Sequence, residues 1–125
     1  MKLKSIHTQN APAAIGPYSQ AVIHDNVLYI SGQIPFDPAT GQLVSEDAAE
    51  QTRQCMENAK AILESVGATM DDVIKTTVFV RNMEEFGRIN EMYGKYFAEH
   101  KPARACVEVS RLPKDVKVEV EMIVA

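Results

Sequence analysis

The sequence predicts an α+β fold, in which two helices pack on one face of a mixed sheet of about six strands. Two segments carry apolar residues at steps of three and four, which is the period of a helix. Shorter segments between and around them are rich in β-branched residues or alternate apolar with polar residues. The order is strands, helix, strand, helix, strands, and we expect residues 1–125 to form a single domain.

The N-terminal third predicts a loop, a hairpin and a turn. Two prolines and a glycine in Asn10–Pro17 indicate an ordered loop, because each proline also restricts the residue before it. The strand-like segments Ala21–His24 and Val27–Ser31 flank Asp25–Asn26, a pair suited to a tight hairpin turn. Phe36–Gly41 is rich in residues that favour turns.

The first helix is expected to start near Ser45. Its apolar face consists of Ala48, Thr52, Cys55, Met56, Ala59, Ile62, Leu63 and Val66. Ser45 or Asp47 can cap the first turn, and Gly67 can end the helix in a left-handed conformation.

A buried strand and a second helix follow. Ile74–Val80 is rich in β-branched residues, which favour a strand. Asn82 can cap a helix that we expect to end near Pro102. Its apolar stripe consists of Met83, Phe86, Ile89, Tyr93, Tyr96 and Phe97.

Two alternating segments close the chain. Ala103–Ser110 and Val116–Val124 predict strands, with Leu112–Asp115 as a turn between them. With both helices on one face of the sheet, the other face needs cover, since monomers seldom expose apolar patches above a few hundred Å². We therefore expect the chain to self-associate.

Composition and charge narrow the possible functions. Hydrophobic residues make up 46% and charged residues 24%, which excludes a disordered chain. The net charge of -4 disfavours a nucleic-acid partner. No apolar run is long enough for a membrane helix and no secretory signal is present, so we expect a cytoplasmic protein without a membrane partner. The two cysteines, Cys55 and Cys106, are interpreted as thiols.

Several kinds of site are missing from the sequence. The histidines, His7, His24 and His100, form no spacing that would hold a metal. The glycines form neither a dinucleotide fingerprint nor a phosphate loop. No nucleophile elbow and no aromatic platform for single-stranded RNA is present.

Four local features allow both a chemical and a purely structural interpretation. Arg104 starts an apolar strand, where its charge needs a ligand anion or a structural ion pair with a nearby Glu. Glu119 lies between two valines, and a solvated polar row is the plainer interpretation. Tyr18 follows a proline-stiffened turn and can simply pack. At Ser31–Gly32 the missing side chain permits close approach to the backbone, although a bulge explains it equally well.

These features fall in motifs that resemble the reactive-intermediate deaminases, closest to the archetypal 2-iminobutanoate/2-iminopropanoate deaminase branch. The resemblance covers nearly the whole chain in the family's order and spacing. Its segments are Gly16–Gln20, Ser31–Pro35, Lys75–Val80, Pro102–Val109 and Leu112–Glu121. The stretch between His100 and Pro102 is shorter than in the archetype, which affects the rim of the cleft.

The resemblance implies a single imine-deaminase domain with a chorismate-mutase-like fold. Three such subunits would form a homotrimeric barrel with active sites between neighbours. The implied reaction, which needs no cofactor and no metal, hydrolyses small 2-imino acids and their enamine tautomers to 2-oxo acids and ammonia. Arg104 would bind the substrate carboxylate and Glu119 would position water. The residues that would line the pocket are Tyr18, Ser31, Gly32, Asn90 and Cys106.

Two points stay open at the level of sequence. If the last two strands pair with Ser110 opposite Val116, Arg104 and Glu119 project from opposite faces; pairing Cys106 with Glu119 would bring them to one face, and assembly across subunits is another route. The alternative functions are a non-catalytic sensor of 2-oxo acids and an RNA-cleaving or chaperone-like role known in the family.

Overall fold

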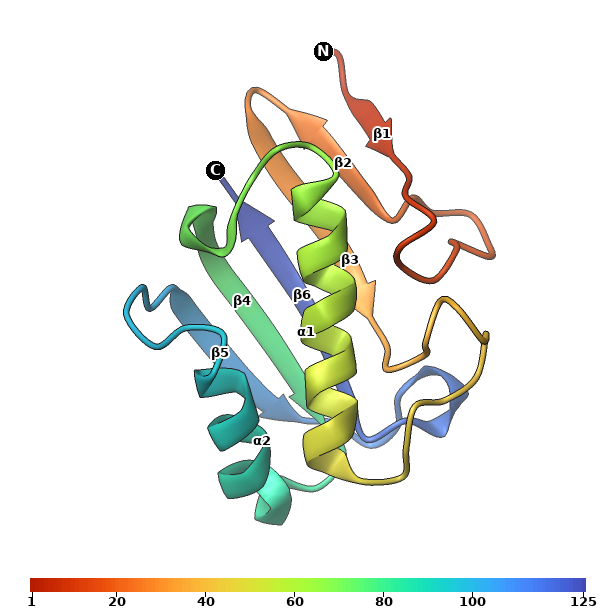
Figure 1. Cartoon of the computed structure of the whole chain (residues 1–125), viewed down its shortest axis with the longest axis vertical. Helices are drawn as coiled ribbons and strands as arrows, with labels where there is room; N and C mark the ends of the chain where they lie inside the picture. The colour runs from red at the N-terminus through yellow and green to blue at the C-terminus, as the bar shows by residue number, and fades with distance from the viewer.

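In the computed structural model, which describes all residues 1–125, two helices lie on one face of a six-stranded sheet (Figure 1). This confirms the predicted α+β architecture. The elements in chain order are β1 (Lys4–Ile6), β2 (Ala21–His24), β3 (Val27–Gln33), α1 (Ala48–Glu64), β4 (Val73–Val80), α2 (Phe86–Gly94), β5 (Ala103–Glu108) and β6 (Val118–Val124), with short 3₁₀ turns at Met70–Asp72, Met83–Glu85 and Pro113–Asp115.

The strand order in the sheet is β1-β2-β3-β6-β4-β5. Strand β5 pairs in parallel with β4, while the other neighbouring pairs are antiparallel. Because α2 returns the chain to the start of β4, the strand after it runs parallel to β4. Consequently β4 separates β5 from β6, and neither of the two registers considered for a pair between the last strands occurs.

The hairpin predicted at Asp25–Asn26 is confirmed. Both residues have positive φ, 49° and 64°, as a two-residue hairpin turn of the primed type requires. Strand β1 was not predicted, because its three residues give too short a pattern. It pairs with β2 at the edge of the sheet, with Ser5 opposite Val22.

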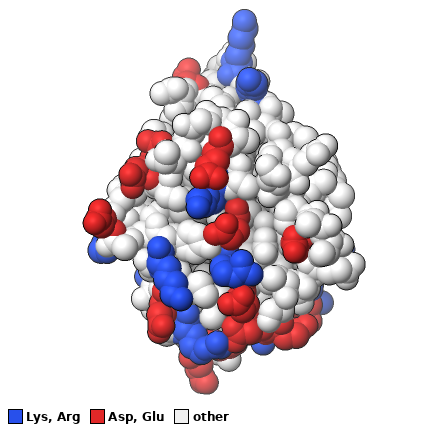
Figure 2. Space-filling model, viewed as in Figure 1, with Lys and Arg blue, Asp and Glu red and all other residues white.

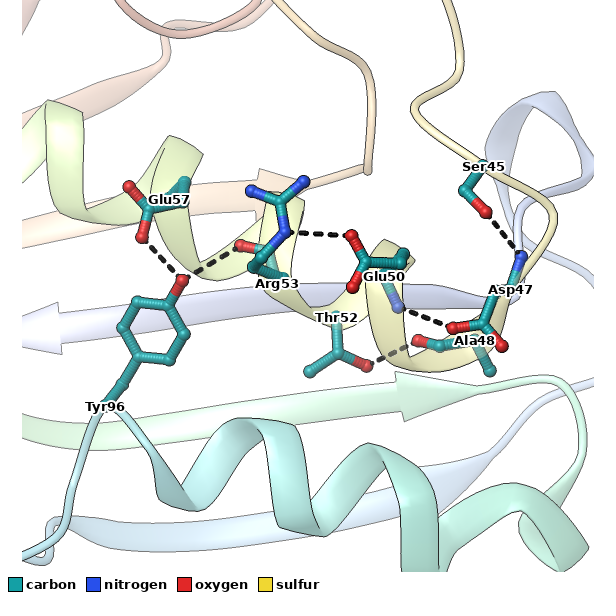
Figure 3. Close-up of polar contacts among 8 residues, drawn as sticks. All are labelled: Ser45, Asp47, Ala48, Glu50, Thr52, Arg53, Glu57 and Tyr96. Carbon is teal, nitrogen blue, oxygen red and sulfur yellow. Dashed lines mark hydrogen bonds and ion pairs between the residues drawn. The ribbon is translucent and has the colours of Figure 1, made fainter.

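Helix α1 begins where the capping pattern predicted. Asp47 is the N-cap and accepts a hydrogen bond of 3.0 Å from the backbone N–H of Glu50 (Figure 3). Ser45 acts one step earlier, since its hydroxyl accepts from the N–H of Asp47 at 2.9 Å. Gly67 has φ +83°, consistent with its expected role after the helix end.

The predicted extent of the second helix is wrong at its C-terminal end. Asn82 accepts from the N–H of Glu84 as a cap, but α2 ends at Gly94, well before Pro102. Glycine weakens a helix, and beyond it side-chain bonds to other elements hold the backbone in turns. Phe97 nevertheless stays buried, so the apolar stripe continues to pack after the helix has ended.

The core lies between the helices and the sheet. Its largest fully buried side chains from α1 and the central strands include Met56, Ile62, Leu63 and Met122. The opposite face of the sheet carries Tyr29 and Val107, which are 45% and 41% exposed. No helix of the chain is both long and apolar enough to span a membrane.

Candidate functional site

Arg104 lies on β5 opposite Thr76 and projects to the helix-covered side of the sheet. Its Nη1 donates a hydrogen bond of 2.6 Å to Oδ1 of Asn90 on α2. The guanidinium carbon lies 4.8 Å from the centre of the Tyr93 ring and 5.4 Å from that of Phe86. Neither an aromatic face nor an amide neutralises the charge. The structural ion pair with a glutamate, one interpretation of this residue, is absent.

A cleft of about 430 Å³ opens beside Arg104. It has no acidic residue in its wall, which consists of Asn90, Tyr93, Gly94, Phe97, Lys101, Pro102 and Arg104. The Tyr93 hydroxyl shares a hydrogen bond of 2.7 Å with the hydroxyl of Thr76, and burial raises the pKa of Tyr93. Tyr93 is therefore neutral at physiological pH. The charged residues in the wall of the cleft, Lys101 and Arg104, are both positive.

Glu119 projects to the opposite face of the sheet from Arg104. It lies opposite Phe79 in the pairing of β6 with β4. The side chain is half-buried, and this burial, followed by the charge of Glu121, raises the pKa of Glu119 above its usual 4.5. Glu119 therefore does not belong to a fully solvated row of polar residues. A carboxylate made more basic in this way is better suited to accept a proton.

Gly32 makes room for the Glu119 carboxylate. The register of β3 against β6 shifts between Ile30 and Gln33, so a bulge is present at this position. A Cβ at Gly32 would lie 2.8 Å from the carboxyl carbon of Glu119. Both interpretations of Gly32 therefore apply together, because the bulge occurs where the missing side chain admits a carboxylate.

Tyr18 and Ser31 lie near Gly32. Tyr18 is 54% exposed and lines a second cavity, of about 500 Å³, together with Gly32. The Ser31 hydroxyl donates 2.6 Å to the carbonyl of Ser19, which ties the loop that carries Tyr18 to β3. The proline-stiffened loop is thus held against the end of the strand with Gly32.

Cys106 belongs to the Arg104 side of the sheet. It lies opposite Val78 and packs partly buried against the core, and this burial raises the pKa of its thiol. A raised thiol pKa keeps Cys106 protonated and weakly nucleophilic. Cys106 and Cys55 are both free thiols, as interpreted from the sequence.

The predicted site residues therefore form two groups within one chain. Arg104, Asn90 and Cys106 share the side of the sheet that bears the helices. The other group gathers around Gly32 and β6 and consists of Tyr18, Ser31, Gly32 and Glu119. Because positions on β5 and β6 are separated by β4, no single chain brings Arg104 and Glu119 together.

Sequence reasoning missed two lysines in the cavity walls. Lys101 lines the Arg104 cleft, and Lys114 lines the cavity that holds Tyr18 and Gly32. Lys114 and the next residue, Asp115, have positive φ of 58° and 60°, a strained backbone for residues with side chains. The sequence predicted a turn at Leu112–Asp115, but nothing in it indicated that Lys114 would line a cavity.

The chain is similar to known proteins over nearly its full length. A family model described as Endoribonuclease L-PSP matches residues 8–125. A RutC family protein of Pyrococcus horikoshii is 58% identical over 94% of both chains. The Escherichia coli protein named 2-iminobutanoate/2-iminopropanoate deaminase is 53% identical, covering 96% of this chain and 95% of the relative.

Solved structures agree with these relatives. The crystal structure of a putative endoribonuclease from Thermotoga maritima superposes with a TM-score of 0.96 at 50% identity, covering 100% of this chain and 98% of that one. With matches of this identity and coverage in both sequence and structure, the chain belongs to the reactive-intermediate deaminase (L-PSP/RutC) family, in its archetypal 2-iminobutanoate/2-iminopropanoate deaminase branch.

Proposed function

We propose that this protein is a cofactor-independent enzyme that hydrolyses reactive 2-imino acids to 2-oxo acids and ammonia. The observation that carries the proposal is the Arg104 guanidinium, which has no carboxylate partner and faces a cleft without acidic residues. A permanently charged group in such a cleft favours an anionic ligand. Membership of the deaminase branch supports a small 2-imino acid as that ligand.

Arg104 would bind the carboxylate of the imino acid. Its planar guanidinium offers two parallel N–H donors to one carboxylate, and the hydrogen bond to Asn90 together with the Tyr93 ring orients that plane. When both carboxylate oxygens of the ligand are bound, the neighbouring C=N carbon is held in a fixed position. Cys106, on the same side of β5, would contact the substrate without attacking it, because hydrolysis of an imine needs no covalent intermediate.

Glu119 would position and deprotonate the attacking water. Water adds to the C=N carbon, the C–N bond then breaks, and ammonia leaves while the carbonyl oxygen comes from the water. One carboxylate can accept the water proton and return a proton to the departing nitrogen, and the raised pKa of Glu119 favours both steps. We propose that Tyr18, Ser31 and Gly32 complete this part of the pocket.

The two halves of the site require a second subunit. We propose a homotrimeric barrel in which the uncovered sheet face lies inside and each active site takes Arg104 from one chain and Glu119 from its neighbour. Two observations support this assembly: the halves lie on opposite faces of one sheet, and the face that bears Tyr29 and Val107 has no cover in the chain. Residues 1–125 would then act as one catalytic domain that needs its neighbours.

A coupled assay tests the reaction. A pyridoxal-phosphate-dependent serine or threonine dehydratase generates the imine in the presence of an amine scavenger, whose adduct is followed by absorbance. Adding this protein should lower the adduct yield and speed the release of ammonia, whereas the Arg104→Ala variant should do neither. Equal adduct yields with and without the wild-type protein would contradict the proposed function.

A further inference from the structure

A second cation, Lys101, stands in the wall of the Arg104 cleft. Its Nζ donates hydrogen bonds to the backbone carbonyls of Ala98 at 2.8 Å and Phe97 at 3.3 Å. These bonds limit the motion of a side chain that is usually mobile. Lys101 takes part in no ion pair, so its charge remains available to a ligand.

The segment that carries Lys101 is itself fixed from two sides. On one side, the Tyr96 hydroxyl donates a hydrogen bond of 2.5 Å to the carboxylate of Glu57 on α1 (Figure 3). On the other, Nε2 of His100 lies 2.6 Å from the carbonyl oxygen of Val73 at the start of β4. The Lys101 backbone is therefore positioned before any ligand arrives, which reduces the entropy lost on binding.

The donors of the cleft suit a ligand with acceptors at both ends. Arg104 uses the Oδ1 atom of Asn90, and the Asn90 amide nitrogen has no hydrogen-bond acceptor within the chain. Two cations and this amide face a cleft without a carboxylate, although the chain as a whole carries a net charge of -4. A ligand with a single carboxylate satisfies Arg104 alone and leaves Lys101 without an anion.

The spacing of the two cations limits the length of the ligand. Lys101 and Arg104 are three residues apart, so their Cα atoms are separated by at most about 11 Å. Both residues line the same cleft, so a ligand inside it can lie between them. Between a guanidinium and an ammonium so placed, a diacid with four or five carbons can contact both.

We propose that the cleft takes 2-imino acids that carry a second carboxylate, the imines of four- and five-carbon 2-oxo diacids. Arg104 binds the carboxylate next to the imine and Lys101 binds the distal one. This inference rests on the proposed function and specifies its substrate class. The reaction is unchanged: water adds to the C=N carbon, the C–N bond breaks, and ammonia and a 2-oxo diacid are released without any oxidant.

Calorimetric titration with two product analogues tests the proposal. 2-Oxoglutarate and 2-oxopentanoate have the same five-carbon chain. The last carbon is a carboxylate in 2-oxoglutarate and a methyl group in 2-oxopentanoate. The wild-type protein should bind 2-oxoglutarate about tenfold more tightly, the effect of one partly exposed charge-assisted contact. Lys101→Gln should abolish this difference, whereas Lys101→Arg should keep most of it.

Lys95→Gln is the matched control, because Lys95 lies just after the end of α2 and is not part of the wall of the cleft. It should keep the wild-type preference. Equal affinities in the wild-type protein, or a preference that persists in Lys101→Gln, would overturn the diacid proposal. Ammonia release from 2-iminopropanoate is measured on the same wild-type sample; its absence contradicts the proposed reaction, whereas the two affinities decide the diacid preference by themselves.

Discussion

At the scale of single residues, Arg104 is set apart by the combination of its contacts. Its polar partner is an amide and its flat faces meet aromatic rings, so the chain orients the guanidinium without neutralising it. The other paired arginines, such as Arg88 with Asp47 and Arg81 with Asp115, have carboxylates at 2.7 and 3.0 Å. This contrast is the one we expect between a ligand-binding arginine and structural ones.

Arg104→Lys keeps the charge and removes the planar fork. We expect this change to lower kcat/KM for 2-iminopropanoate by about 1.5 to 3 kcal/mol of transition-state stabilisation, the value of a hydrogen bond to a charged group. The loss should be measured by initial rates with thermal unfolding as a check on the fold. A variant that turns over near the wild-type rate would show that the guanidinium plane is not needed.

Gly32→Ala should affect the reaction more than the fold. The new methyl group would occupy the place of the Glu119 carboxylate, which can move away because it ends a flexible side chain. Displacement of a catalytic group by about 1 Å costs roughly 100-fold, so we expect kcat to fall about 10- to 100-fold. Gly87→Ala is the control, since a Cβ at that helical glycine meets nothing within 4 Å and should leave kcat unchanged.

Ionisation of Glu119 should raise the activity of the protein and lower its stability. Its pKa is raised in the folded state, so the ionised form opposes folding at neutral pH and this penalty vanishes once the pH is below the ordinary value of 4.5. We expect Glu119→Gln to have a much lower kcat but a higher Tm than the wild type at pH 7. The difference in Tm should shrink as the pH falls.

The wild-type pH profile gives a second readout of the same group. Since the base must be ionised, kcat/KM should decline on the acid side at a pH above 4.5. A rate profile that stays flat down to pH 4, or a Glu119→Gln variant with wild-type kcat, would remove Glu119 from the mechanism.

At the scale of elements, one contact joins α1 to the segment that follows α2. Figure 3 shows Tyr96 pointing at α1, where its hydroxyl lies 2.5 Å from Glu57 and 3.4 Å from the carbonyl of Arg53. Burial, and then the hydrogen bond to Glu57, raise the pKa of Tyr96, so the hydroxyl remains the donor at physiological pH. This contact fixes the backbone that leads into the Arg104 cleft.

Tyr96→Phe should therefore loosen the segment without emptying the core. We expect a loss of about 1 kcal/mol in the free energy of unfolding, because the contact is partly exposed to solvent. Urea unfolding of Tyr96→Phe, Glu57→Gln and the double variant gives the coupling between the two groups. If the losses of the single variants simply add, the hydrogen bond contributes nothing measurable.

Local sequence patterns predicted the elements well and their neighbours poorly. The cap at Asp47, the turn at Asp25–Asn26 and the left-handed Gly67 depend on residues close in sequence, and all three are confirmed. The end of α2 was missed because Tyr96 and Phe97 continue the apolar period while being held by distant groups. The pairing of β5 with β4 could not be predicted either. The alternation of residues along a strand indicates which side chains share a face of the sheet, but not which strand lies beside it.

The candidate site shows the same division. Arg104 and Gly32 could be singled out from the sequence, but their assignment to a site came from the resemblance of their motifs to a known family. Their separation into two groups depends on β4 lying between β5 and β6, a long-range property. Lys101 was missed because only the folded loop places it in the wall of the Arg104 cleft.

At the scale of the whole molecule, the charges on the helix-covered face favour a small ligand over a nucleic acid. Figure 2 shows acidic and basic side chains interleaved on the helix-covered face, without an extended basic field. Neutralising many phosphates requires such a field. The local positive charge of the Arg104 cleft is instead confined to two side chains, which matches a small anion.

The proposed trimer predicts that two inactive variants restore activity when mixed. Arg104→Ala and Glu119→Gln each destroy a different half of the site, so either variant alone should be inactive. In a trimer assembled at random from equal amounts of both, a site is intact when its arginine and its glutamate come from the chains that retain them. By the symmetry of a closed ring, about one quarter of the sites in the random mixture should then be intact, and about one third in hybrids that contain both variants.

Co-expression of the two variants with different tags, followed by purification of hybrids through both tags, provides the sample. Sedimentation measures the assembly and ammonia release from 2-iminopropanoate measures the active fraction. A site completed within one chain cannot recover in this way, because every chain in the mixture lacks one half. Hybrids that sediment as trimers and remain inactive would therefore place both halves in the same chain, against the geometry of the sheet.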